Sequence, residues 1–144
     1  SVDGDVVQYR DWGIPLGRRF RALKLWFHLA LDGPEAICTR LRRDLDNARW
    51  LAAQVEQTAG WELVAPLTLQ TVCVRHNPSQ LSGAAHDAHT LGWVDAINRS
   101  GRAFLTSSKL DDRWMVRVSV GVEATQRQHV EALWALMQEV AQGS

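Results

Sequence analysis

The sequence has little of several features that would place it in an extracellular or membrane-bound class. Its 144 residues include only two cysteines, Cys38 and Cys73. We interpret them as buried thiols of a cytoplasmic protein, and whether they meet stays open. No apolar run is long enough to span a bilayer, and the N-terminus has neither the charged nor the apolar region of a signal peptide. We therefore expect a soluble protein without a membrane partner.

An excess of charge of one sign is also absent. Sixteen basic and sixteen acidic side chains cancel, which removes the electrostatic footprint of a general nucleic-acid or membrane-surface binder. We expect no nucleic-acid partner. Hydrophobic residues make up 46% of the chain, so a single packed domain is expected. The chain begins without Met and reaches its most distinctive motif within a dozen residues, and we expect a fragment of a longer protein.

The most distinctive stretch is residues 14–27, which read Ile-Pro-Leu-Gly-Arg-Arg-Phe-Arg-Ala-Leu-Lys-Leu-Trp-Phe. Pro15 fixes φ and Gly17 permits backbone angles that other residues avoid, so a constrained turn should lead into a helix over 18–31. Apolar residues cover nearly every side of that helix, which indicates partners on several faces. A second, amphipathic helix should start at Pro34 and continue to about Gly60.

The remainder of the chain alternates strand and helix patterns. Residues 61–66 and 67–76 suit strands on either side of Pro66, residues 77–89 suit a loop, and residues 91–98 suit a short helix. Strands over 103–110 and 114–121 should form a hairpin, and a capping box of Thr125 and Gln128 should open a closing helix. The pattern predicts an α+β fold with an antiparallel β-sheet covered by helices on one face.

Most chemistry-bearing residue types have ordinary explanations. His86 and His89 fall in the predicted loop without a cluster of further ligands, so we interpret them as surface histidines and expect no metal. Ser107 and Ser108 lack a nucleophile motif and should be strand residues. Of the seven tryptophans, Trp26, Trp114 and Trp134 fall on apolar stripes, which indicates packing instead of base or sugar stacking for these three. Trp12 belongs with the opening motif. Arg117 is the one charge within the strand 114–120, and the pattern alone indicates a strand residue facing water.

Several motifs together resemble one family. Tyr-Arg-Asp-Trp at 9–12 and Ile-Pro-Leu-Gly-Arg-Arg at 14–19 are followed by similar segments at 62–75, 95–106, 113–121 and 129–134. This series resembles the C-terminal domain of pyridoxal-phosphate (PLP) dependent group II amino-acid decarboxylases, especially the aromatic-L-amino-acid or L-DOPA decarboxylases. The resemblance implies the small C-terminal domain of a fold-type I PLP enzyme. Residues 1–17 would lead in from a large domain, and residues 18–144 would form the small domain.

The resemblance also implies a function and site residues. The parent would be a carboxy-lyase that uses pyridoxal 5'-phosphate on aromatic L-amino acids, as a homodimer in which this domain closes over the substrate site. Arg117 matches the position that binds the substrate carboxylate, and Leu16 and Gly17 match part of the pocket for the substrate ring. Gly13 stands where many relatives have a larger polar residue. The amino-acid substrate, and simple decarboxylation versus an oxidative variant, stay open.

The family's PLP-binding lysine has no counterpart in this sequence. Lys24 and Lys109 are its only lysines, and neither matches that motif. We therefore expect no catalytic and no cofactor-binding residue in this chain, PLP held mainly by the large domain of the same chain, and no activity of the chain alone. The alternative is a stand-alone ferredoxin-like or ACT-like module that binds a small regulatory ligand. The opening motif and the apolar first helix favour the decarboxylase, and a His-Lys pair in a large domain upstream would decide between the two.

Overall fold

The computed structural model describes residues 19–77 and 81–143. The chain forms two compact units, one up to Ile37 and one from Cys38 onward. Helix α2 (Gly33–Gln57) begins in the first unit and continues in the second. No helix within the described ranges is long and apolar enough to cross a membrane.

In the first unit, helix α1 (Arg21–Leu31) confirms the predicted helix and begins three residues later than expected. It buries none of its residues. Its large apolar side chains are exposed, from 41% for Leu23 to 80% for Leu31. The helix ends at Asp32, whose backbone N–H donates to His28, and Gly33 follows with a φ of 77°. Glycine suits this position because other residues avoid positive φ.

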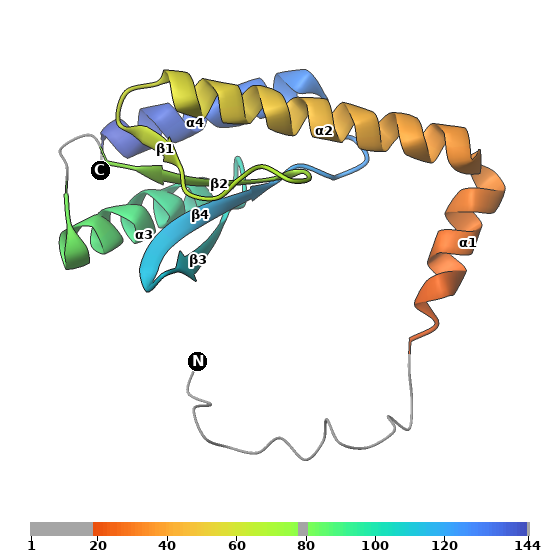
Figure 1. Ribbon diagram of the computed structural model, residues 1–144, viewed down its shortest axis with the longest axis horizontal. Helices are drawn as coiled ribbons and strands as arrows, with labels where there is room; N and C mark the ends of the chain where they lie inside the picture. The colour runs from red at the N-terminus through yellow and green to blue at the C-terminus, as the bar shows by residue number, and fades with distance from the viewer. Residues whose placement is uncertain (1–18, 78–80, 144) are drawn as a thin grey trace, which may run out of the picture. The chain divides into compact units, whose positions relative to one another are not determined.

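The second unit contains a four-stranded antiparallel sheet with strand order β1-β2-β4-β3 (Figure 1). The strands are β1 (Trp61–Leu63), β2 (Thr71–His76), β3 (Thr106–Leu110) and β4 (Arg113–Ser119). Helix α3 (Gly83–Ser100) connects β2 to β3, and helix α4 (Arg127–Gln142) closes the unit. The predicted α+β fold is confirmed, with strands on both sides of Pro66 as expected.

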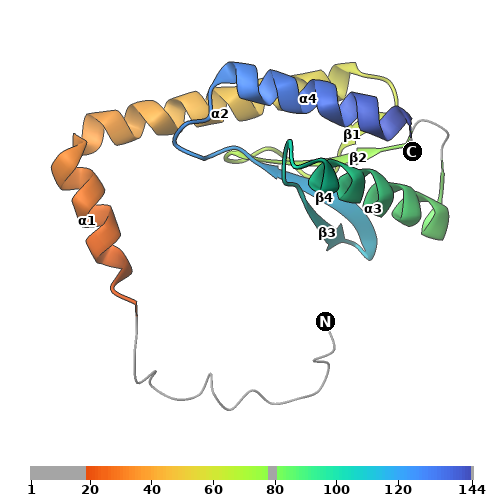
Figure 2. The same cartoon turned by 180° about the vertical axis from the view of Figure 1, so that it is seen from behind.

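One hydrophobic core joins the three helices of this unit to one face of the sheet. Val72 and Val74 of β2 lie opposite Val118 and Val116 of β4, and all four side chains are buried in the same cluster. The rings of Trp61, Trp93 and Trp134 meet edge to face, with centroids 5.6 and 5.0 Å from Trp61. Helices α2 and α4 lie side by side (Figure 2), since Arg127 donates to the carbonyl of Asp46 and stacks over Trp50. The expected packing role is confirmed for Trp134, whereas Trp114 is half-buried and Trp26 on α1 is 59% exposed.

The β3–β4 hairpin is confirmed with a tighter loop than predicted. Asp111 and Asp112 both have positive φ, at 51° and 58°, as a two-residue type I′ loop requires. Arg113, expected in the loop, instead pairs with Leu110 as the first residue of β4. A type I′ loop matches the right-handed twist of the strands, so β4 begins directly after Asp112.

Three local predictions were wrong. Helix α3 starts at Gly83, so His86 and His89 lie on a helix and not in a loop. The last helix is capped by Gln126 and His129, one residue beyond the predicted Thr125 and Gln128, because either register places a polar pair three residues apart. The interpretation of both cysteines as buried thiols also fails. Both are free thiols, Cys38 exposed and Cys73 half-buried.

Candidate functional site

The side of the sheet that faces away from the core carries the predicted site residue on β4. Strand residues alternate between faces, so the pairing register assigns this side, called here the open face, unambiguously. Most of its side chains are polar. The open face consists of Glu62, Thr71, Cys73, Arg75, Thr106, Ser108, Leu110, Arg113, Met115, Arg117 and Ser119.

Arg117 lies in the middle of the open face. Cys73 of β2 lies directly opposite it on one side and Thr106 of β3 on the other. Arg117 is exposed, and its guanidinium makes no hydrogen bond or ion pair with any residue in the part of the chain that the structure describes. The nearest polar pair on the face, Thr71 and Ser119, is occupied by a mutual hydroxyl contact of 3.3 Å. Arg117 is therefore a cation with all five donors available.

Arg75 lies on the same face in a different environment. It is 6% exposed, and its guanidinium donates to the main-chain carbonyls of Trp114 at 2.9 Å and of Leu110 and Arg113 at 3.3 Å each. Glu62 lies 3.9 Å from its Nη1. Burial lowers the pKa of Arg75, and the nearby Arg113 lowers it further. Arg75 was not predicted as a site residue, although an arginine at the end of a run as apolar as Val-Cys-Val is a detectable signal.

Three histidines gather where β2 meets α3. His76 Nδ1 and His89 Nε2 are 2.9 Å apart, and His86 Nε2 lies 3.3 Å from the carbonyl of His76. His76 and His86 are 2% and 1% exposed, so the interpretation of His86 as a surface residue was wrong. The ring of His76 packs on Trp61 with a centroid distance of 4.5 Å. Burial, with repulsion from His89 and His86, lowers the pKa of His76 to about 4. Burial likewise lowers the pKa of His89.

These side chains do not form a metal centre. Among the described residues, no group of three or more His, Cys, Asp or Glu side chains could hold an ion. With a pKa of about 4, His76 is neutral at neutral pH, which suits its contact with a second imidazole. The cluster therefore contributes to packing in the described structure.

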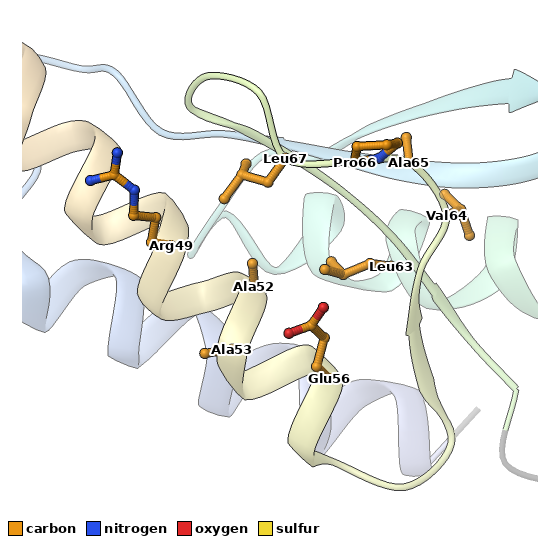
Figure 3. A pocket seen from close by; sticks show the side chains of 9 residues that line it. All are labelled: Arg49, Ala52, Ala53, Glu56, Leu63, Val64, Ala65, Pro66 and Leu67. Carbon is orange, nitrogen blue, oxygen red and sulfur yellow. The ribbon is translucent and has the colours of Figure 1, made fainter.

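The described residues do not fit a PLP site by themselves. Lys109 holds its amino group 5.2 Å from the centre of the Trp114 ring, and Lys24 is exposed on α1. One groove, about 530 Å³, lies between α2 and the β1–β2 connection and is lined by residues such as Glu56, Leu63 and Leu67 (Figure 3). Neither this groove nor the other two prominent grooves of the described chain contains a lysine. No catalytic step is therefore assigned to PLP on these residues.

Arg117 lines none of the three grooves. The structure therefore places this predicted substrate residue on an open surface. Leu16 and Gly17 lie outside the described residues. Ser107 and Ser108 lie in β3, as expected. Of the three predicted site residues, only Arg117 therefore has a structural environment that can be described.

Comparison with known proteins identifies similar sequences and a similar fold. Residues 3–77 match the family model described as pyridoxal-dependent decarboxylase conserved domain. Phenylacetaldehyde synthase of Arabidopsis thaliana is 35% identical over 94% of this chain and 28% of its own length. Tryptophan decarboxylase 2 of Oryza sativa subsp. japonica is 34% identical over 98% of this chain and 28% of its own.

A solved structure gives the same result. The crystal structure of Catharanthus roseus tryptophan decarboxylase in complex with L-tryptophan matches with a TM-score of 0.79 and 29% identity, over 96% of this chain and 30% of that chain. The chain thus spans a little over a quarter of the length of the curated relatives described above. Since the matching family model covers more than half of its 144 residues, the chain belongs to the family of pyridoxal-dependent decarboxylases.

Proposed function

We propose that the chain is the small domain of a PLP-dependent decarboxylase of aromatic L-amino acids, and that Arg117 receives the substrate carboxylate. The observation that carries the proposal is the Arg117 guanidinium at the centre of the open face, which has no bonding partner in the described part of the chain. The similarity to tryptophan decarboxylases, one of them solved with L-tryptophan, supports the substrate class. It also disfavours the alternative of a stand-alone ferredoxin-like or ACT-like module.

The chemistry of arginine suits this role. Its planar fork donates two parallel charge-assisted hydrogen bonds to a carboxylate, so it fixes the direction of that group as well as binding it. Too strong a hold would stabilise the bound substrate as much as the transition state and would not raise the rate. The proposed role is therefore orientation of the carboxylate. Pyridoxal 5'-phosphate would be held by the large domain, because the described residues do not form a site for it.

The decisive experiment replaces Arg117 with lysine in the full-length enzyme. Lysine keeps the charge but loses the fork, so we expect a loss of roughly 1.5–3 kcal/mol, about ten-fold to a hundred-fold in kcat/KM, with the cofactor still bound. Misalignment should also raise transamination relative to decarboxylation. Both products and the cofactor absorbance are measured.

Arg113→Lys is the matched control, because Arg113 is an exposed arginine on the same strand. It should leave both the rate and the product ratio unchanged. An Arg117→Lys enzyme with normal kcat/KM and a normal product ratio would return Arg117 to the role of a solvent-facing strand residue.

The exposed apolar side chains of helix α1 support a proposal about partners. Phe20, Leu25, Trp26, Phe27 and Leu31 are between 48% and 80% exposed, more apolar surface than a single helix normally leaves in water. We propose that α1 packs against the large domain of the same chain or a second subunit of a homodimer.

The isolated 144-residue chain tests this partner proposal. It should self-associate or show rapid amide exchange in α1. Phe27→Glu should reduce association measured by sizing, whereas Lys24→Glu on the same helix should reduce it less, since Lys24 adds no apolar surface. A monomer with fully protected amides over residues 20–31 would contradict the proposal.

Two further proposals concern the substrate pocket and the location of the protein. Leu16 and Gly17 are proposed to bound the pocket for the substrate ring, because they match that position in the family and a glycine leaves room for an aromatic group. A cytoplasmic location is proposed because Cys38 and Cys73 are both free thiols, which is typical of a reducing compartment.

A further inference from the structure

Arg75 is a buried arginine whose partners are main-chain carbonyls. Arginine is seldom this buried, and replacing a buried ion pair with apolar residues often stabilises a protein. Here the guanidinium bonds the end of β3 through Leu110 and the start of β4 through Arg113 and Trp114. These residues flank the Asp111–Asp112 loop. Arg75 therefore holds the two strands together at the base of the hairpin loop.

The contacts of Arg75 lie where the regular pairing of β2 with β4 ends. The β2–β4 register runs from Thr71 and Ser119 to Val74 and Val116. The first three residues of β4 pair with β3 alone. At Trp114, two side chains make the connection instead. Arg75 donates a hydrogen bond to the Trp114 carbonyl, and Asp87 of α3 accepts one from the Trp114 N–H at 3.1 Å. The start of β4 is thus attached to β2 by the Arg75 side chain.

This attachment lies close to the proposed carboxylate site. Trp114 precedes Arg117 by three residues, about 10 Å along an extended strand. Arg75 and Arg117 are also both on the open face, on neighbouring strands. A shift of β4 along β2 would move the Arg117 guanidinium by the same amount, and a displacement of about 1 Å can reduce a rate about a hundred-fold.

We propose that Arg75 is a positioning residue that fixes the start of β4 and thereby the place of Arg117 relative to the rest of the sheet. The inference rests on the proposed function of Arg117. It explains why a polar side chain is buried at this point: an apolar residue could fill the space but could not bind three carbonyls of two strands. Glu62, 3.9 Å from Nη1, extends the connection to β1.

The test uses Arg75→Met and Arg75→Lys in the full-length holoenzyme, with Arg99→Met as control. Methionine keeps the apolar part of the chain and loses every hydrogen bond. Lysine keeps the charge but cannot reproduce the geometry of three bonds. Arg99 is a surface arginine of α3 that pairs with Asp95, so its loss should change nothing. Assays are run well below the thermal midpoint of each variant.

We expect both Arg75 variants to lose about ten-fold in kcat/KM and to release more transamination product per turnover. Affinity for the aromatic amine, which has no carboxylate, should stay within two-fold of wild type. A merely structural role would lower the thermal midpoint but leave the kinetics of the folded enzyme and its product ratio unchanged, and that result would overturn the proposal.

A double-mutant cycle separates this inference from the proposed function. If Arg75 acts through Arg117, Arg75→Met should have little further effect in the Arg117→Lys background, because interacting residues are not additive. Normal kinetics of Arg117→Lys would defeat the proposed function itself. A normal product ratio in Arg75→Met, with Arg117→Lys impaired, would defeat only the positioning role.

A final variant covers the case in which neither Arg75 variant folds. Glu62 is half exposed and its contact with Arg75 is long, so Glu62→Gln should fold. It weakens the hold on the guanidinium and should raise the transamination share about two-fold. An unchanged share would then overturn the proposal.

Discussion

On strand β4, neighbouring residues point to opposite faces of the sheet and meet very different surroundings. Val116 and Val118 are at most 2% exposed and pack under three helices. Arg117, between them, is exposed and has no partner among the described residues. One strand therefore supplies both the core and the candidate site. Substitutions on the two faces should change different measurements: the free energy of unfolding on one, substrate alignment on the other.

The open face contains a second contrast, between two of its arginines. Arg75 is 6% exposed and bonded to three carbonyls, whereas Arg117 is exposed and makes no hydrogen bond or ion pair within residues 19–77 and 81–143. Both residues are arginines on the same face, so the difference in burial and hydrogen bonding comes from their positions in the sheet. Arg75 lies beside the end of the hairpin, where main-chain acceptors are left over, and Arg117 lies within the regular ladder, where they are already used.

The largest expected effect is on the free energy of unfolding and concerns the core on the covered face of the sheet. Trp93 is fully buried and meets Trp61 edge to face at 5.6 Å. Trp93→Ala should lower the free energy of unfolding by about 3–5 kcal/mol, because it removes the apolar burial and leaves a cavity. Trp26→Ala, at an exposed position, is the matched control and should change it little. Urea unfolding measures both, and equal losses would show that Trp93 is not a core residue.

The next effect depends on pH and concerns His76, at the edge of the covered face. Its folded pKa of about 4 lies below the ordinary value of 6.5. Between these values the unfolded chain binds more protons, so stability falls as pH falls, by about 3 kcal/mol once pH 4 is reached. No such loss is expected above pH 6.5. Urea unfolding of the wild type between pH 8 and pH 4.5 measures it.

A substitution assigns that loss to His76. His76→Phe keeps a ring on Trp61 but cannot take up a proton, so the loss below pH 6.5 should shrink. His28→Phe on α1, where the side chain is 56% exposed, should retain the wild-type dependence. If both variants behave like the wild type, His76 does not cause the loss.

The sequence predicted the features that repeat along the chain. The alternation of Val116, Arg117 and Val118 predicted the two faces correctly, and the charged loop predicted the hairpin. The first half of α3 was missed because its buried side includes His86 and Thr90, which are polar. The role of Arg75 was missed for another reason: its partners are main-chain carbonyls 35 to 39 residues away, and a sequence pattern does not encode such contacts.

The smallest effect belongs to the hairpin loop, which lies on neither face. Asp112 has a φ of 58°, where glycine is less strained than other residues, so Asp112→Gly should stabilise the chain by roughly 0.5 kcal/mol. Gly101→Ala is the opposite case. With a φ of 68° and no atom within 4 Å of an added Cβ, it should destabilise by about 1 kcal/mol through backbone strain alone. Thermal unfolding measures whether each substitution raises or lowers the stability. Because the loop touches neither the core nor Arg117, the product ratio of the full-length enzyme should not change in Asp112→Gly. A changed ratio would mean that the loop, as well as Arg75, sets the position of β4.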